Sequence, residues 1–579
     1  MRLADRARPL RSRARSVTPP AWLGPFGREP WIVLGPLILA QWLALLVFML
    51  TVRHNSWLYY QGGDQTFYWT TGWMFSHGRL PTAEVGWGWS YVLTPLAGAA
   101  GNIVLSGLPG IILLDTIVLL PVALLAMYGI GARIGGRVFG YWTAALWIAL
   151  PYVAIPLFVQ RYHGKYIEQT LPQTFGLTPL ADFPSMVLLI VAAYLVVRAL
   201  DTRDWREAVL AGLVVGFAFS VKPSNVIFFP APAVAFLIAL RFRQLLYFGA
   251  ALLPGVLLVV LWKQRGLGTQ PLFAAGGDGT LAALGIPLPS GTLAGGIGRY
   301  VNINWDHLRE NRDSLREFFW AIRPLQWVAL AGVLALLRRS WAKGALIAVW
   351  FYAFLVVKGS SEHARVEDAT FFRLLMPSFP AFVLLIAAAP LLVPKLGNAL
   401  ATRYPPGKSS SRRLTRPIVV AAIVLVALPT VVLAATRVQT GPTAVRNDAQ
   451  HTLVPVSDSL HLTGTKGKSG VSLSWQAPYH GPVGVFYVVL RSPHEFPDPT
   501  NPEERKVDDG VVCREQRSGA ARDCHLYMRR IKATKDLSFV DHPPRGRWAY
   551  RIGLAANWLD DPTRGDVLLV SEPVKVEVG

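Results

Sequence analysis

Repeated apolar segments constrain the fold of this chain more than any other feature. A helix of about 20 apolar residues spans the hydrocarbon core of a bilayer. The first such segment covers residues 31–52, and others recur up to residue 436. The 579-residue chain is 52 % hydrophobic and 16 % charged, whereas soluble proteins carry about 25 % charged residues. The sequence therefore predicts a polytopic α-helical membrane protein.

The number of spans follows from the positions of the basic loops, because such loops stay in the cytoplasm. If residues 88–106 cross the membrane, there are about twelve spans and two basic loops fall outside. If they form a juxtamembrane or re-entrant helix, there are about eleven spans and every basic loop is inside. We adopt the second topology, which places the C-terminal part outside. Its spans are 31–52, 109–131, 138–159, 180–199, 208–221, 223–240, 244–262, 324–338, 344–358, 372–394 and 417–436.

The N-terminal residues 1–30 contain seven arginines and are expected to form a cytoplasmic tail. A cleaved signal peptide is not expected, because the segment 31–52 is too long for an h-region and no small-residue cleavage site follows it. The net charge of +22 does not predict nucleic-acid binding, since the basic residues cluster in loops that face anionic lipid. We expect a multi-pass protein of the bacterial plasma membrane, with lipids as partners.

The chain becomes polar after residue 436. Residues 437–470 are expected to be a linker. Short runs with alternating apolar residues between turn residues predict an extracytoplasmic antiparallel β-sandwich over residues 471–579. Trp475 early and Trp548 late in this region resemble a fibronectin type III module.

The only two cysteines of the chain, Cys513 and Cys524, both lie in this C-terminal region. An external compartment allows them to form a disulfide. A zinc site is not expected, because two cysteines without a second pair nearby do not supply four ligands.

One acid stands in a turn of the first external loop, which covers residues 53–87. Asp64 follows Gly62 and Gly63, and glycines let the backbone bend and approach a ligand closely. The surrounding Trp and Tyr residues also fit an interfacial aromatic belt. A belt does not require the Gly-Gly-Asp turn, so we interpret Asp64 as a functional residue, by analogy with ionisable groups at membrane depth.

Further polar residues are expected at the same external face, although each also fits a solvated loop. Lys222 stands out, because a Lys-Pro break between apolar runs is costly unless the ammonium group has a partner. Arginine and lysine can hold a phosphate, and a carboxylate can take the proton of a hydroxyl. The set therefore suits a lipid phosphate and a sugar. Besides Asp64, the candidates are Glu84, Arg161, His163, Lys165, Asp182, Lys222 and Arg373.

These motifs resemble the GT-C superfamily of membrane glycosyltransferases, the group of the protein mannosyltransferases and the lipid A aminoarabinose transferase. The likeness covers about residues 30–395 and implies a catalytic domain within residues 31–436. It also implies that polyprenyl-phosphate-linked sugars are the donors. The motifs are Gly63-Asp64-Gln-Thr-Phe-Tyr-Trp69, Leu180-Ala-Asp182-Phe-Pro184, Gly216-Phe-Ala-Phe-Ser-Val-Lys222-Pro-Ser224 and Phe372-Arg373-Leu-Leu-Met-Pro-Ser-Phe-Pro380.

The resemblance implies an enzyme that transfers the sugar, with inversion, to an extracytoplasmic hydroxyl. Asp64 matches the catalytic acid and would be the general base, while Asp182 would orient the acceptor. Arg373 and Lys222, together with Arg161 or Lys165, would hold the donor phosphate. No cofactor is implied with certainty, and a divalent cation, Mg²⁺ or Mn²⁺, at Asp182 is left open.

The first loop departs from the protein mannosyltransferases in one respect. It has a lone Asp64 in place of their Asp-Glu pair, so the acceptor stays open among a glycan, a glycolipid and a protein. The external β domain would then be an accessory module that binds acceptor glycan.

Two other classes of function remain as alternatives. A transporter or lipid-linked sugar flippase would place polar groups near the membrane midplane, often with inverted repeats, and the sequence has no internal repeat. A non-catalytic assembly or adhesion protein would use the β domain alone and would leave the external polar residues unexplained.

Overall fold

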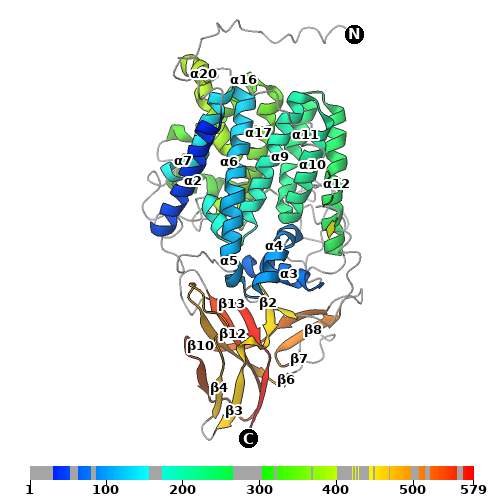
Figure 1. Ribbon diagram of the computed structural model, residues 1–579, viewed down its shortest axis with the longest axis vertical. Coiled ribbons are helices and arrows are strands. Elements are labelled where there is room, and N and C mark those ends of the chain that lie inside the picture. The colour runs from blue at the N-terminus through cyan, green and yellow to red at the C-terminus, as the bar shows by residue number, and fades with distance from the viewer. Residues whose placement is uncertain are drawn as a thin grey trace.

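The computed structural model consists of a helical body and a β domain that lies against one end of it (Figure 1). The short helices α3 (Asp64–Ser76), α4 (Trp87–Ala100) and α5 (Val104–Leu113) lie at that end, next to the β domain. The structure describes residues 30–51, 63–79, 86–154, 172–264, 303–318, 323–366, 370–400, 420, 424, 428–429, 443–447, 450, 452–467, 470–496, 507–515, 522–556 and 565–579.

Within these residues, six helical segments are long and apolar enough to cross a membrane. This finding supports the expected membrane fold, whereas the expected count of about eleven spans is not confirmed. Large apolar side chains on their outer faces stay exposed, for example Leu50, of which 75 % is exposed, and contact with lipid explains that exposure. The six segments are Trp31–Leu50, Val104–Gly135, Asp182–Thr202, Phe242–Val259, Trp341–Gly359 and Thr370–Leu392.

Most of the other expected spans form helices that are shorter or broken, whereas the expected span 417–436 lies almost wholly outside the described residues. The segment 223–240, for example, is divided by Pro230 into two helices, since proline cannot donate a backbone hydrogen bond within a helix. The remaining helices are α2 (Trp31–Thr51), η2 (Leu114–Leu119), α6 (Leu120–Gly135), α7 (Arg137–Ala154), η4 (Pro172–Leu177), α9 (Asp182–Thr202), α10 (Trp205–Val221), η5 (Pro223–Phe228), α11 (Pro230–Ile238), α12 (Phe242–Gln264), α15 (Trp305–Phe318), η6 (Arg323–Trp327), α16 (Val328–Arg339), α17 (Trp341–Gly359), α18 (Thr370–Leu375), η7 (Met376–Ser378), α19 (Phe379–Ala388), η8 (Ala389–Leu392) and α20 (Pro394–Leu400).

The segment 88–106, expected to lie along the membrane interface, is divided between α4 and α5. Gly101, with a φ of 89°, ends α4, because other residues rarely adopt this backbone conformation. Helix α4 packs against both α3 and α10. A Cβ atom at Gly88 would lie only 2.4 Å from Ser220 Oγ, so the absence of a side chain there lets α4 rest directly on the end of α10.

Three of the basic loops meet at one end of the helical body. Asp201, at the end of α9, contacts Lys343 Nζ at 2.6 Å and Arg133 Nη1 at 3.4 Å. Lys343 Nζ also donates to the carbonyl of Arg133 at 2.8 Å. Since the 21 residues of α9 span about 30 Å, Asp182 at its start lies at the opposite end from this basic cluster.

The C-terminal domain consists of two sheets. A large sheet has the order β10-β5-β12-β13-β2-β1-β9-β8-β7-β6 with β14 beside β12, and a small sheet has the order β11-β4-β3. Strand β12 is buried along most of its length because it pairs with β5, β13 and β14. The strands are β1 (Ala444–Asn447), β2 (Thr452–Ser457), β3 (Thr463–Gly467), β4 (Gly470–Ser474), β5 (Phe486–Pro493), β6 (Glu495–Phe496), β7 (Val507–Asp508), β8 (Val511–Glu515), β9 (Arg522–Leu526), β10 (Arg529–Thr534), β11 (Ser538–Asp541), β12 (Gly546–Ala556), β13 (Asp566–Ser571) and β14 (Val574–Val578).

The β domain differs from the expectation in two ways. Residues 437–470, expected to be a linker, contain the short strands β1, β2 and β3. Strands β1 and β3 are short and polar, and Pro455 interrupts the apolar run of β2. The large sheet is also mixed, since β13 pairs with β2 and β1 pairs with β9 in parallel. The alternating runs of the sequence, residues 471–475, 485–490, 547–554 and 567–570, lie to within one residue inside strands β4, β5, β12 and β13.

The two cysteines are register partners on β8 and β9, where Cys513 stands directly opposite Cys524. Cys524 is disulfide-bonded. Because the chain has only two cysteines, this agrees with the expected pair.

The topology generates a labelling prediction. In intact cells, a membrane-impermeant maleimide should label Glu577→Cys on β14 but not Thr202→Cys at the end of α9, because the β domain and the basic loops lie at opposite ends of the body. Both side chains are exposed. The wild-type chain is the control for background. External labelling of position 202 would contradict the topology.

Candidate functional site

Four of the residues predicted from the sequence meet at the end of the helical body that faces the β domain. Arg373 Nη2 donates to Asp64 Oδ2 at 2.9 Å, and Arg373 Nε lies 3.5 Å from Asp182 Oδ2. Lys222 Nζ donates to Asp182 Oδ1. The four side chains thus form a continuous chain of ion pairs, Asp64–Arg373–Asp182–Lys222.

Each of these residues stands at or near the end of a helix. Asp64 is the first residue of α3 and Asp182 the first residue of α9, so both carboxylates lie in the favourable field of a helix N-terminus. Lys222 follows the last residue of α10, and Arg373 lies on α18. The extended backbone of Lys222, required before Pro223, ends α10 and turns the ammonium toward Asp182.

Asn225 holds the turn that carries Lys222. Its Nδ2 atom donates to Ser185 Oγ and to the carbonyl of Ala218, both at 2.7 Å. Ser185 lies one turn after Asp182 on α9, so these bonds fix the end of α10 against the start of α9. The distance between the Lys222 ammonium and the Asp182 carboxylate is set by this contact.

The segment that carries Arg373 is held on both sides. Downstream, Trp350 Nε1 on α17 donates to the carbonyl of Pro377 at 3.0 Å. Upstream, the buried side chain of Asn311 on α15 donates to the carbonyls of Gly359 and Ala364, at 2.9 and 2.6 Å. The amphipathic helix α15 therefore clamps the loop that leads to α18.

The charges of the site balance, but their access to solvent differs. Asp182 is only 2 % exposed, and a buried carboxylate needs cationic partners, which Lys222 and Arg373 supply. In contrast, 44 % of the Asp64 side chain and 34 % of the Arg373 side chain are exposed. The site therefore has a fixed inner pair, Asp182–Lys222, and an accessible outer pair, Asp64–Arg373.

Tyr68, one turn after Asp64 on α3, is a site residue that the sequence analysis missed. Burial and the carboxylates of Asp64 and Asp182 raise the pKa of the Tyr68 phenol well above its usual value. The phenol therefore stays protonated and keeps a hydrogen to donate. In the sequence, only the spacing of one helical turn from Asp64 indicates a role for Tyr68, and an interfacial aromatic belt explains the same tyrosine more simply.

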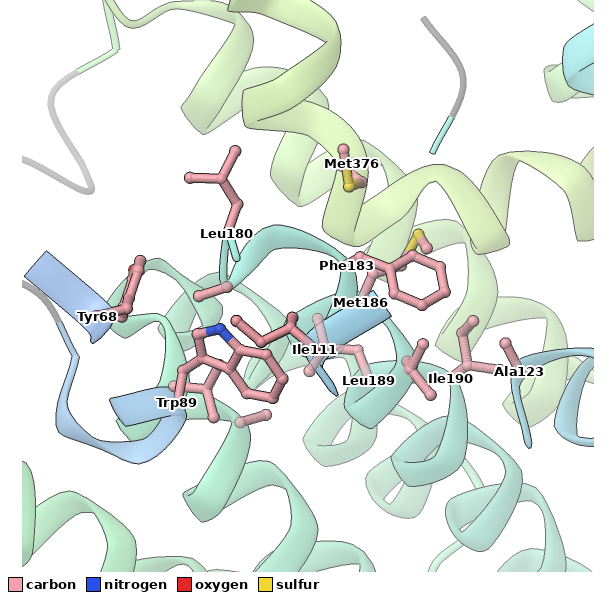
Figure 2. Packing of buried hydrophobic residues seen from close by; sticks show 14 of the residues in the cluster. Tyr68, Trp89, Ile111, Ala123, Leu180, Phe183, Met186, Leu189, Ile190 and Met376 are labelled. Atoms are coloured by element: carbon pink, nitrogen blue, oxygen red, sulfur yellow. The ribbon is translucent and has the colours of Figure 1, made fainter. Parts of the chain in front are cut away.

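Apolar side chains pack beside the charged residues. Figure 2 shows Tyr68, Trp89, Leu180, Phe183 and Met376 in one cluster contributed by α3, α4, α9 and neighbouring segments. Trp89 Nε1 donates to the carbonyl of Pro179 at 2.8 Å and so fixes the loop that precedes Asp182. This packing leaves little freedom for the helix ends that carry the acids.

The described residues do not form a metal site by themselves. No group of three or more His, Cys, Asp or Glu side chains suited to a metal occurs among them. Asp64 and Asp182 supply carboxylates, but the Arg373 guanidinium lies between them and is not a ligand. The expectation of a divalent cation therefore stays a prediction, and no step is derived through one.

Four predicted site residues, Glu84, Arg161, His163 and Lys165, lie outside the described residues.

Comparison with known proteins supports the resemblance seen in the sequence. A family model described as dolichyl-phosphate-mannose-protein mannosyltransferase matches residues 169–262, the part that contains Asp182 and Lys222. This match confirms the resemblance to the GT-C glycosyltransferases. No curated protein matches the chain.

Solved structures of an archaeal enzyme also match. The Archaeoglobus fulgidus oligosaccharyltransferase tethered with an acceptor peptide is 14 % identical with a TM-score of 0.36, covering 73 % of this chain and 56 % of that chain. The same archaeon's AglB with an inhibitory peptide and a dolichol-phosphate is 13 % identical with a TM-score of 0.35, covering 70 % and 55 %. Its complex with zinc and sulfate is 14 % identical with a TM-score of 0.35, covering 71 % and 54 %. The chain spans a little over half the length of these structures.

The Asn225 contacts generate a prediction. Asn225→Ala should lower the free energy of unfolding by about 1–3 kcal/mol, because two buried hydrogen bonds are lost. It should also weaken the binding of polyprenyl phosphate, because Lys222 loses its support. Asp204→Ala, which removes the cap at the far end of the same helix α10, is the matched control and should cost about 1 kcal/mol without a change in binding. Equal effects of both variants on binding would contradict the role of Asn225.

Proposed function

We propose that the protein is a GT-C glycosyltransferase that moves a sugar from a polyprenyl-phosphate donor to an acceptor hydroxyl on the extracytoplasmic side of the membrane. The observation that carries this proposal is the convergence of Asp64, Asp182, Lys222 and Arg373 at one end of the helical body. The family match over residues 169–262 supports a lipid-linked donor. The acceptor is a glycan, a glycolipid or a protein.

The cations of the site suit the donor phosphate. The exposed part of Arg373 can bind two phosphate oxygens through its planar guanidinium, and Lys222 adds a second positive charge. As the glycosidic bond breaks, negative charge grows on the leaving phosphate, so fixed cations stabilise the transition state more than the ground state. Arg161 and Lys165 are candidates for further phosphate contacts.

Asp64 is the proposed general base. It takes the proton of the acceptor hydroxyl while the oxygen attacks the anomeric carbon from the face opposite the phosphate. The bond between the anomeric carbon and the phosphate oxygen breaks, the configuration is inverted and polyprenyl phosphate leaves with the bonding electrons. Asp182 orients the acceptor and keeps Lys222 and Arg373 in place.

The outer ion pair Asp64–Arg373 implies that the donor binds before Asp64 can act as a base. Without donor, the Arg373 guanidinium donates to Asp64 and occupies the carboxylate that must accept a proton. An arriving phosphate competes for the same guanidinium and releases Asp64 beside the acceptor. Donor binding would therefore activate the base.

The central test is transfer by purified protein from a radiolabelled polyprenyl-phosphate sugar. Asp64→Asn should lower kcat about 100-fold or more, because general-base catalysis contributes roughly that much. Asp306→Asn on α15 is the matched control, since Asp306 is an exposed acid paired only within its own helix turn among the described contacts. Near-normal turnover by Asp64→Asn would remove Asp64 from the mechanism, and substrate transport without transfer would favour a flippase.

If Arg373 exchanges between Asp64 and phosphate, the substitution that lowers kcat should strengthen the binding of phosphate. Asp64→Asn should bind sugar-free polyprenyl phosphate roughly two- to five-fold more tightly, because a partly exposed ion pair worth up to about 1 kcal/mol no longer competes for Arg373. Arg373→Gln should bind it more weakly. Tryptophan fluorescence titration in nanodiscs measures both affinities, and weaker binding by Asp64→Asn would contradict the exchange.

A further inference from the structure

One hydrogen bond joins the β domain to the residue that precedes the proposed base. The backbone amide of Gly63 donates to Asp566 Oδ2 at 2.6 Å, and Asp566 is the first residue of β13. The two residues are 503 positions apart in the chain. Helix α3, which follows Gly63, packs against strand β2 of the same domain.

Gly63 is well suited to transmit this contact to Asp64. Its φ of 64° is rarely adopted by other residues, and its carbonyl accepts from Thr66 N at 3.2 Å and Thr66 Oγ1 at 2.9 Å. Both polar groups of Gly63 are therefore bonded, the carbonyl within α3 and the amide to Asp566. The start of α3, where Asp64 projects, is fixed from both sides.

The backbone on either side of Asp566 is held by the uncharged side chain of Gln450. The Gln450 side chain donates to the carbonyl of Gly565 at 3.0 Å and accepts from the amide of Val567 at 2.9 Å, so it spans the backbone on either side of Asp566. Asn447 Nδ2 donates to the same Gln450 oxygen at 2.9 Å. The start of β13 is thus rigid before it meets Gly63.

Phe486 adds a steric limit to this arrangement. A Cβ atom at Gly565 would lie 1.8 Å from Phe486 Cζ, so only glycine lets the strand start lie flat on that ring. The side chain of the next residue, Asp566, points toward α3, where it accepts from the Gly63 amide.

We propose that Asp566 is a positioning residue for Asp64: the β domain holds the proposed base in place through the Gly63 amide and so completes the catalytic site. This inference rests on the proposed function of Asp64 as general base. Arg373 draws the Asp64 carboxylate toward Asp182, and Asp566 anchors the backbone immediately before it. When phosphate takes Arg373 away, Asp566 still fixes the backbone in front of the carboxylate; without Asp566, the start of α3 keeps only its own bonds to Thr66.

The test compares three variants of the full chain in nanodiscs, each assayed for kcat, KM and thermal unfolding. Asp566→Ala removes the acceptor and should lower kcat roughly 10-fold or more, with KM for the donor within about two-fold of wild type. Asp566→Asn keeps an oxygen that can accept from Gly63 and should restore kcat to within about three-fold. Asp536→Ala, an exposed acid in the β10–β11 turn, is the matched control and should leave kcat unchanged.

A purely structural role would give a different result. Asp566→Ala would then lower the unfolding temperature while kcat per folded molecule stayed at the wild-type value, and that outcome overturns the inference. If Asp566→Ala does not fold, Gly63→Ala tests the same contact from α3, since the space around it is open but its φ is strained for alanine; unchanged kcat in that variant also overturns it. If Asp64→Asn keeps its turnover, the proposed function itself fails, whatever Asp566 does.

A pH series checks that Asp566 is buried in the contact. Burial raises the pKa of Asp566 to about 6 from an ordinary 3.8, and the Gly63 amide bond opposes part of this rise. A raised pKa means that the folded state favours the protonated acid, so the associated stability is present below about pH 4 and is lost as the pH rises through about 6. On the facing element, α3, the first residue is Asp64, whose carboxylate is paired with Arg373.

The unfolding temperature of wild type relative to Asp566→Asn should therefore fall between pH 4 and pH 7. The Asn side chain does not titrate, so the variant isolates this one group. A difference that stays constant across that range would show that Asp566 is not buried against α3 and would overturn the contact on which the inference rests.

Discussion

The guanidinium of Arg373 is shared between two carboxylates that come from different helices, and the rest of the site depends on this sharing. Asp182 is buried, and removing a carboxylate from water costs several kcal/mol unless cations compensate. Lys222 alone would compensate Asp182, but Arg373 also reaches the exposed Asp64 and so joins an interior pair to a solvent-facing one. The ends of α3, α9, α10 and α18 must therefore meet at one point.

The packing around the site serves this constraint. Asn225 fixes α10 to α9, Asn311 fixes the loop before α18, and the small volume of Gly88 brings α4 onto the end of α10. None of these residues carries the proposed chemistry. Their role is to hold charged side chains at helix ends to within hydrogen-bond distance, where electrostatic stabilisation of a transition state is effective.

The sequence predicted the membrane class, the β domain and four residues that the fold brings together. The length of an apolar segment, and an ionisable residue beside or between such segments, are local signals that can be read without the fold. It did not predict the helix breaks at Pro230 and Gly101 in detail, nor strands β1 to β3, since β1 and β3 are short and polar and β1 and β2 join the large sheet through the distant strands β9 and β13. Tyr68 and Asp566 were missed for the same reason. The role of a tyrosine among many aromatics, or of an acid in a β strand, becomes evident only from the residues that it contacts in the folded protein.

The contact between Gly63 and Asp566 also has a consequence for biosynthesis. Residue 566 is the 503rd residue that the ribosome adds after residue 63, so this hydrogen bond cannot form until translation is nearly finished. A nascent chain with all its helices already inserted still lacks the anchor in front of Asp64. The order of synthesis thus delays the final geometry of Asp64 until the β domain has folded, and a chain that ends before residue 566 lacks this anchor.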